Sequence, residues 1–198
     1  MLILVRHGRT PANAAGLLQG RLDQDLDEHG QRQAAATAAF VMERTEVDVV
    51  IASPLRRAVQ TASAFGVEPE IDDRWIELSY GEYEGTPVTG VPSAVWEQWR
   101  ADPHFVPTGG ESFATLHERV HGACAAIVER AAEQNVVVVS HVSPIKSAVA
   151  WALDVDPGIA FHSHLDQASV CRIEFRGGRP LLLTFNETPS SPERAPDA

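Results

Sequence analysis

The sequence predicts an α/β fold, a three-layer α/β/α sandwich with helices on both faces of a mainly parallel central sheet. The first observation is that short apolar runs alternate along the chain with longer segments that suit helices. The second is that three of these runs, Leu2–Val5, Val47–Ala52 and Val136–Ser140, are almost continuously apolar, as strands buried on both faces are. Because helical segments separate these runs, we expect the strands to pair in parallel.

The remaining elements follow from signals at their ends. Helices are expected at about Glu28–Arg44 with Asp27 as N-cap, Pro54–Phe65 with Ser53 as N-cap, Ser93–Arg100, Ser112–Glu133 and Pro144–Leu153. Further strands are expected at Glu68–Ile71, Ala168–Phe175 and Pro180–Phe185, with a turn at residues 176–179 between the last two. We expect one domain over residues 1–186 with an irregular insertion at about 82–110. Residues 187–198, rich in Pro, Ser, Glu and Ala, are expected to be a disordered tail.

Composition and charge narrow the possible partners. The 198 residues carry a formal net charge of −11, which argues against nucleic acid and against an anionic membrane surface as partners. No apolar run approaches the length of a membrane span, and Met1 leads directly into the first strand, so no secretory signal peptide is expected in this numbering. Cys124 and Cys171 have neither metal-site nor disulfide-framework spacing. A cytoplasmic enzyme is the expectation, and its oligomeric state is left open.

Two of the predicted strands end in a histidine. Arg6, His7 and Gly8 follow the first strand, and His141 follows Val136–Ser140. Ligands of open α/β sheets bind beyond the carboxyl ends of the strands, so both histidines are expected at a site. Arg6 supplies a fork of donors for phosphate oxygens, and His7 supplies a nucleophilic nitrogen near neutral pH. The alternative interpretation is a strand end with an ordinary polar turn.

A third signal lies at the start of the predicted helix after Ala52. Arg56 and Arg57 sit near its amino end, where the helix dipole disfavours cations. This placement is favourable once an anion fills the site, so it indicates a bound phosphate or carboxylate.

These stretches together resemble the histidine phosphatase superfamily, which includes cofactor-dependent phosphoglycerate mutases and many acid phosphatases. The matching segments occur in family order and are Arg6–Thr10 with Asn13, Gln19–Arg21, Leu26–Ala34, Ser53–Ala62, Glu77 with Tyr80–Gly85, Gly109–Ser112 and Val139–His141. The resemblance implies a phosphoglycerate mutase-like fold over nearly the whole chain up to about its last fifth.

The resemblance also implies a role for each site residue. His7 would attack phosphorus, and Arg6, Arg57 and His141 would hold the phosphoryl oxygens. Glu77 would protonate the leaving oxygen, and Asn13, Gln19 and Gly20 would lie in a loop over the phosphate. Two alternatives stay open: Glu77 as a solvated strand-edge charge, and ordinary turn chemistry for the loop residues. Arg56 is expected to be a solvated cation on the helix face. Because a second cation is disfavoured beside Arg6 and Arg57, the pKa of His7 is expected to be lowered.

The expected activity is hydrolysis of small phosphomonoesters through phosphohistidine, without metal and without cofactor. The glycine that usually follows the second histidine is replaced by Val142, and Ser140–Lys146 looks more like the acid phosphatase and α-ribazole phosphatase branch. The alternatives are a phosphoglycerate mutase and a catalytically silent phosphate-binding protein. The physiological phosphomonoester is left open.

Several other residues receive no catalytic role. Arg21, His162 and His164 are left unassigned, and Lys146 is expected to be a solvated helix residue. His117 and His121 have zinc-ligand spacing but no third ligand, so they are expected to be helix-surface histidines. Aromatic residues of the insertion, among them Trp96, Trp99 and Phe105, are expected to form a local core.

Overall fold

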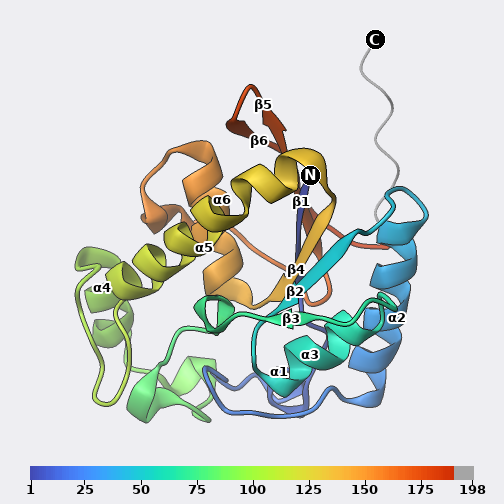
Figure 1. The fold of residues 1–198 in the computed structure, drawn as a ribbon. Helices are drawn as coiled ribbons and strands as arrows, with labels where there is room; N and C mark the ends of the chain where they lie inside the picture. Colours follow the sequence, from blue (N-terminus) through green and yellow to red (C-terminus); the bar gives the residue numbers. More distant parts are fainter. Residues whose placement is uncertain (190–198) are drawn as a thin grey trace.

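A six-stranded mixed sheet forms the centre of the protein in a computed structural model that describes residues 1–189 (Figure 1). Its strand order is β3-β2-β4-β1-β5-β6. The strands are β1 (Leu2–Arg6), β2 (Val49–Ala52), β3 (Glu70–Ile71), β4 (Val136–Ser140), β5 (Val170–Arg176) and β6 (Arg179–Glu187). The first four pair in parallel, and β5 and β6 are antiparallel. The predicted α/β class with a mainly parallel sheet is therefore confirmed.

Helices cover both faces of this sheet because the side chains of its central strands alternate between two apolar cores. Ile3 and Val5 of β1 pack with α2 and α3, whereas Leu2 and Leu4 pack with α5 and α6. The α-helices are α1 (Pro11–Ala14), α2 (Glu28–Met42), α3 (Arg56–Ser63), α4 (Ser93–Ala101), α5 (Phe113–Glu133) and α6 (Val142–Leu153). Figure 1 shows α5 and α6 on one side of the sheet and α2 and α3 on the other.

Two helices, α3 and α6, begin at other residues than the sequence predicts. Helix α3 begins at Arg56, and its N-cap Leu55 provides no side-chain cap, so the prediction that Ser53 caps this helix is wrong. Helix α6 begins directly after His141, earlier than the predicted start at Pro144. Asp27 does cap α2, since its side chain accepts the Gly30 N–H. Proline suits a first helical turn, but here both Pro54 and Pro144 were misleading markers of the helix start.

Several short elements had no counterpart in the prediction. They are α1 and the 3₁₀ turns Asp73–Trp75, Gly81–Tyr83, Val88–Gly90 and Pro157–Phe161. Strand β6 runs to Glu187, one residue past the domain boundary that was expected after residue 186. The predicted disordered tail otherwise falls mainly on residues 190–198, which lie outside the described residues.

The register between β1 and β4 places the two sequence-predicted histidines together. Arg6 pairs with Ser140, so His7 and His141 both follow at the carboxyl edge of neighbouring parallel strands. The His7 N–H donates to Ser140 O (3.0 Å), and the Ala168 N–H donates to His7 O (3.1 Å). The backbone of His7 is thus fixed from both neighbouring strands.

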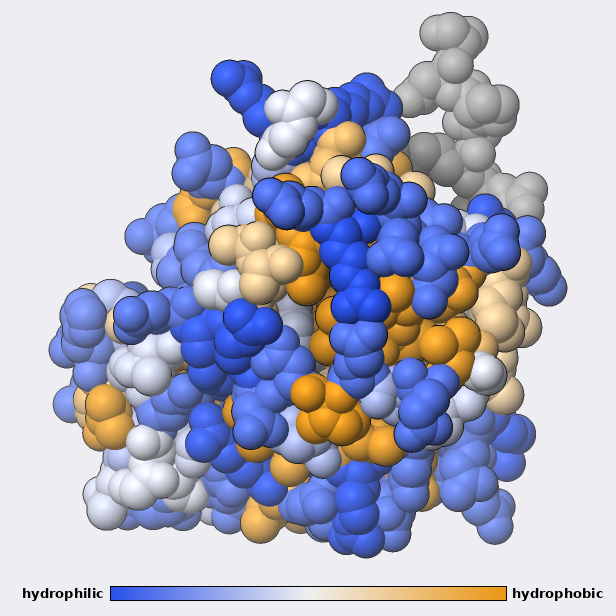
Figure 2. Space-filling view, in the orientation of Figure 1, coloured by the Kyte–Doolittle hydropathy of each residue, from blue (hydrophilic) through white to orange (hydrophobic). Residues whose placement is uncertain are grey.

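Aromatic residues of the segment 82–110 pack in a small local core, as expected, and this core also includes residues from outside the segment. Val91, Val95 and Trp99 are buried there together with Leu18 from the loop after β1, and Tyr83, Trp96 and Phe105 pack around them. Figure 2 shows a largely hydrophilic surface on one face of the molecule, with hydrophobic side chains gathered beside strand β2. Among residues 1–189, no helix combines the length and apolar character needed to cross a membrane.

Two helical glycines should respond oppositely to alanine. A Cβ on Gly30 of α2 would lie 2.0 Å from the backbone oxygen of Arg9, whereas a Cβ on Gly122 of α5 would meet nothing within 4 Å. Gly30→Ala should therefore lower the free energy of unfolding by about 1–3 kcal/mol through overpacking. Gly122→Ala should raise it by about 0.5–1 kcal/mol through helix propensity. Urea denaturation of both variants tests this, and a stabilised Gly30→Ala protein would contradict the packing of α2 against the loop after β1.

Candidate active site

A cavity of about 290 Å³ opens at the carboxyl ends of the parallel strands. All of the predicted site residues except His141 line it: Arg6, His7, Asn13, Gln19, Gly20, Arg57 and Glu77. The wall is completed by Gly16, Leu17, Leu18, Tyr80, Val88 and Val142. Residues that are far apart in the sequence, from Arg6 to Val142, therefore line one cavity, as the family resemblance implied.

His7 lies at the base of this cavity and is 3% exposed. Its Nδ1 is 2.7 Å from Gly8 O. A carbonyl oxygen only accepts, so Nδ1 carries the hydrogen and Nε2 keeps its lone pair. The Arg57 Nε–H donates to that lone pair at 3.2 Å. Burial, helped by the charges of Arg57 and Arg6, holds the pKa of His7 well below its ordinary value, so the expected lowering is confirmed in direction.

Arg57 is held in the cavity by the loop after β1. Its Nη1 donates to Leu22 O (2.8 Å) and its Nη2 to Gly20 O (2.7 Å). Burial lowers the pKa of Arg57 to about 10. Gly20 has φ +52°, and a Cβ there would lie 2.3 Å from a carboxylate oxygen of Glu84, so glycine is needed for this close approach.

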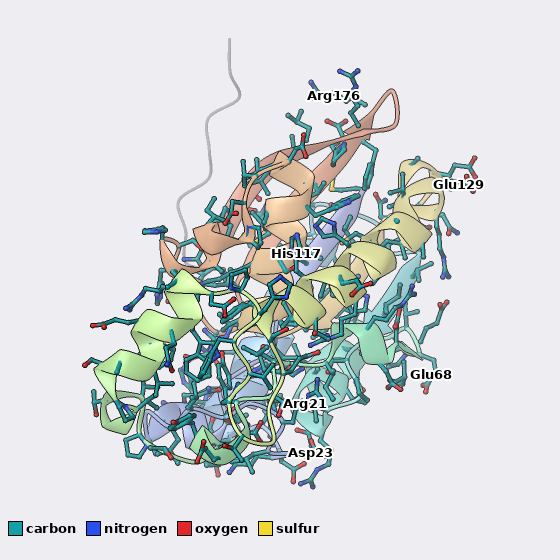
Figure 3. The ribbon with its side chains drawn as sticks, turned by 90° about the vertical axis from the view of Figure 1, so that its left-hand side faces the viewer. Arg21, Asp23, Glu68, His117, Glu129 and Arg176 are labelled. Carbon is teal, nitrogen blue, oxygen red and sulfur yellow. The ribbon has the colours of Figure 1, made fainter. Side chains whose placement is uncertain are left out.

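Arg56 points away from the cavity. It is exposed and forms ion pairs with Asp23 and Asp25, both at 3.2 Å. Figure 3 shows Asp23 at the outer margin of the molecule, with Arg21 further inside. The structure thus places Arg57 in the lining of the cavity and Arg56 outside it, where Arg56 is paired and not merely solvated.

His141 lies beside His7, with 5.0 Å between the two ring centroids. It is fully buried, and its Nε2 is 2.7 Å from Ser53 Oγ. Its Nδ1 has no hydrogen-bond partner. Burial, with Arg57 as the next cause, holds the pKa of His141 well below its ordinary value.

Some of the buried side-chain nitrogens without a hydrogen-bond partner in residues 1–189 belong to the predicted site, namely Arg6 Nε, Gln19 Nε2 and His141 Nδ1. Others lie elsewhere, on Trp75, Trp99, His121 and Arg172. Arg6 Nε and Gln19 Nε2 are donors, so they are available to a ligand that brings acceptor oxygens. A tetrahedral oxyanion such as phosphate supplies several acceptor oxygens in one place.

Glu77 lies on the irregular segment between the 3₁₀ turns Asp73–Trp75 and Gly81–Tyr83. It lines the cavity and is only 7% exposed, which excludes the alternative of a solvated strand-edge charge. Its Oε1 accepts the N–H groups of Leu78 (2.7 Å) and Ser143 (3.3 Å). These two hydrogen bonds orient the carboxyl group, and one of them comes from the first turn of α6.

A charged network behind Glu77 was not predicted. Arg21 Nε (3.1 Å) and Arg119 Nη2 (3.3 Å) both donate to Glu77 O, and Glu111 accepts from both arginines at 3.0 Å. Arg119 also donates to Arg74 O. The Gly109–Ser112 motif was a signal for Glu111, but spacing alone does not connect it to Glu77. Arg21 therefore acts on the backbone that carries Glu77.

The remaining loop residue, Asn13, belongs to the unpredicted helix α1. Its Oδ1 accepts from the Thr10 N–H (3.2 Å) and hydroxyl (3.1 Å) in a capping box. This is the ordinary local chemistry that the sequence left open, and it leaves the Asn13 amide at the cavity wall.

The unassigned cations and histidines lie outside the cavity. Lys146 is half-buried and its Nζ donates to Ala160 O (2.8 Å) and Ser163 O (2.6 Å), so the expected solvated lysine is wrong. His162 and His164 are exposed. The rings of His117, labelled in Figure 3, and His121 lie on α5 with 3.8 Å between their centroids and a tilt of 52°. No three potential metal ligands cluster in residues 1–189.

Related proteins match nearly the whole length of this chain in sequence. A phosphoserine phosphatase of Hydrogenobacter thermophilus is 36% identical over 195 residues, covering 94% of this chain and 92% of that protein. A bifunctional protein of Mycobacterium tuberculosis is 34% identical over 195 residues, which are 94% of this chain and 54% of that protein. The chain thus spans about half the length of this mycobacterial relative.

Solved structures show the same fold. The phosphoserine phosphatase of Entamoeba histolytica, as a mutant in complex with phosphoserine, superimposes with a TM-score of 0.84 at 26% identity, covering 93% of this chain and 95% of that one. A putative α-ribazole-5′-phosphate phosphatase of Escherichia coli gives 0.82 at 27% identity, covering 94% and 95%. A family model matches residues 2–188. The protein belongs to the histidine phosphatase superfamily, branch 1.

Proposed function

We propose that this protein hydrolyses small phosphomonoesters through a phosphohistidine on His7. The observation that carries the proposal is the state of the His7 ring: Gly8 O fixes the hydrogen on Nδ1, so Nε2 keeps a lone pair, which attacks phosphorus once Arg57 turns its hydrogen bond to the phosphoryl group. A low pKa keeps this nitrogen unprotonated at neutral pH. The phosphatase names of the relatives support the same activity.

The reaction then runs in two displacements. The Nε2 lone pair forms an N–P bond while the bond from phosphorus to the ester oxygen breaks, and Glu77 gives that oxygen its proton. Arg6, Arg57 and His141 hold the phosphoryl oxygens through both steps. In the second step the Glu77 carboxylate takes a proton from water, the water oxygen bonds to phosphorus, and the N–P bond breaks. Inorganic phosphate leaves and His7 is restored.

The substrate class follows from the cavity and the relatives. About 290 Å³ accommodates a phosphoryl group with a small leaving group, such as that of a phosphorylated hydroxy acid or sugar. Relatives of the chain include a phosphoserine phosphatase and a glucosyl-3-phosphoglycerate phosphatase. We place the reaction in the cytoplasm, which suits the buried free thiols of Cys124 and Cys171.

The proposal is tested by the covalent intermediate. His7→Ala should abolish turnover, because the variant lacks the nucleophile, while circular dichroism stays unchanged. Mixing with radiolabelled substrate followed by an alkaline quench should trap a base-stable phosphoprotein only in the unmutated chain, and acid treatment should then release its label. Robust hydrolysis by the alanine variant would remove the covalent mechanism.

The two adjacent arginines give a matched pair of variants. Arg57→Ala should lower kcat/KM by about 10²–10³, the usual loss for a preorganised donor to a transition state. Arg56→Ala removes exposed ion pairs and should change kcat/KM by less than about threefold. Steady-state kinetics with p-nitrophenyl phosphate measures kcat/KM for both variants. Equal losses would show that both arginines serve the phosphate.

Glu77→Gln should discriminate between leaving groups. An alkoxide needs a proton as it departs, whereas p-nitrophenolate hardly does, so alkyl esters should slow by a much larger factor than the aryl ester. Phosphoenzyme should accumulate with the aryl ester, because the amide no longer takes the proton from water. Glu82→Gln, an exposed carboxylate in the next 3₁₀ turn, is the control. The same factor for both esters, with no phosphoenzyme, would assign the acid elsewhere.

A further inference from the structure

Ser53 has a buried hydroxyl that no step of the proposed reaction uses. It follows β2 at the edge of the sheet where His7 and His141 follow β1 and β4, and it is fully buried. The Leu55 N–H approaches its oxygen at 3.4 Å, and His141 Nε2 lies 2.7 Å from it. Ser53 therefore belongs to the site by position, although it does not line the cavity.

The hydroxyl hydrogen of Ser53 has one acceptor. The Leu55 N–H is a donor, so among residues 1–189 the acceptor within hydrogen-bond distance is His141 Nε2. If Nε2 carried the hydrogen instead, the buried hydroxyl would have no acceptor, which costs the free energy of an unmade hydrogen bond. Counting donors and acceptors thus leaves Nε2 unprotonated.

The same count fixes the other ring nitrogen. A neutral imidazole with an unprotonated Nε2 carries its hydrogen on Nδ1. His141 Nδ1 is buried and has no partner, and the ring lies beside that of His7. A hydrogen on Nδ1 is therefore not used by any protein acceptor and is available to a ligand beside His7.

We infer that Ser53 is a positioning residue that holds His141 as the Nδ1–H tautomer, so that neutral His141 donates to a phosphoryl oxygen. This inference rests on the proposed function for the identity of the acceptor. The opposite tautomer would present a lone pair to the phosphoryl oxygens and repel them. Ser53, which was expected to be a helix N-cap, thus determines which nitrogen of His141 donates a hydrogen bond.

Burial and the charges around His141 keep its ring neutral, so its tautomer decides which nitrogen can donate. The charged and titratable groups that act on His141 are Arg6 at the end of β1, His7 directly after it, Arg57 from α3 and Arg119 from α5. The Glu77 carboxylate also lies nearby, since it accepts the N–H of Ser143, two residues after His141. Three of these are arginines, which disfavour an imidazolium at this position. A neutral ring donates from one nitrogen alone, so the choice of nitrogen decides whether His141 attracts or repels phosphate.

The tautomer is measured directly in the free, full-length protein by long-range ¹H–¹⁵N correlation of the imidazole rings. His141 should show hydrogen on Nδ1, and inorganic phosphate should shift that nitrogen. Hydrogen on Nε2 in the free protein would overturn the inference. Because this measurement needs no turnover, a protein with the Nδ1–H tautomer and no phosphatase activity would refute the proposed function alone.

Ser53→Ala extends the test to kinetics. Loss of the hydroxyl leaves a buried nitrogen unsatisfied and should lower kcat/KM on the order of tenfold at neutral pH. The long-range ¹H–¹⁵N spectrum of the same variant should show hydrogen on His141 Nε2, because the hydroxyl that donated to this nitrogen is gone. A variant that loses activity while His141 keeps its hydrogen on Nδ1 would show that Ser53 has a merely structural role.

The chain offers a matched control in Ser147→Ala. Ser147 is also a buried serine, and its hydroxyl is 2.8 Å from His117 Nδ1, outside the cavity. This variant removes the same kind of hydrogen bond and should leave the His141 tautomer and kcat/KM unchanged. A shift in both variants would attribute the effect to general loosening of the fold and overturn the inference.

Discussion

The parallel pairing of β1 with β4 is the constraint on which the rest of the structure depends. Arg6 lies opposite Ser140, so the residue after each strand is a histidine at the same edge of the sheet. A one-residue slip would turn every side chain of a strand to the other face and would separate the two rings. The apolar alternation of Ile3 and Val5 against Leu2 and Leu4 opposes such a slip, because each set fills a different core. Core packing therefore determines the geometry of the site.

Concentrating positive charge in an acidic protein requires local compensation. The chain carries a net charge of −11, yet the buried Arg57 and the half-buried Arg6 both lie close to His7. Backbone carbonyls provide part of that compensation: Leu165 O accepts from Arg6, and Gly20 O and Leu22 O accept from Arg57. Carbonyl dipoles stabilise a guanidinium without neutralising it, so the positive potential at the cavity is retained for an anion. An acidic carboxylate at the same positions would cancel it.

The sequence is sufficient to predict the fold and the residues at strand ends, because both follow from local patterns. Continuous apolar runs predict the parallel strands, and strand termini place His7 and His141. Glu77 is different, since it lies on a segment without regular structure and its role came from resemblance alone. Arg21, Glu111 and Arg119 are far apart in sequence and meet only when the chain is folded.

The incorrect predictions for Ser53 and Lys146 have the same physical cause. Ser53 and Lys146 both have side chains with obvious local uses, a helix cap and a solvated cation. In the folded protein each side chain instead satisfies a distant partner, His141 for Ser53 and the carbonyls of Ala160 and Ser163 for Lys146. A buried polar group has to find a partner, and local propensity does not reveal which partner tertiary packing brings near.

Ala168 shows how firmly the backbone of His7 is held. Its φ is +56°, a left-handed conformation that costs a non-glycine residue about 1–2 kcal/mol. Its N–H donates to His7 O, and its own carbonyl accepts the Thr37 hydroxyl at 2.7 Å. These two hydrogen bonds join α2, β1 and the start of β5, and they oppose relaxation of the strained residue. A nucleophile that attacks phosphorus in line needs its ring nitrogen fixed in direction. The strain at Ala168 is therefore retained where it fixes the chain that carries that ring.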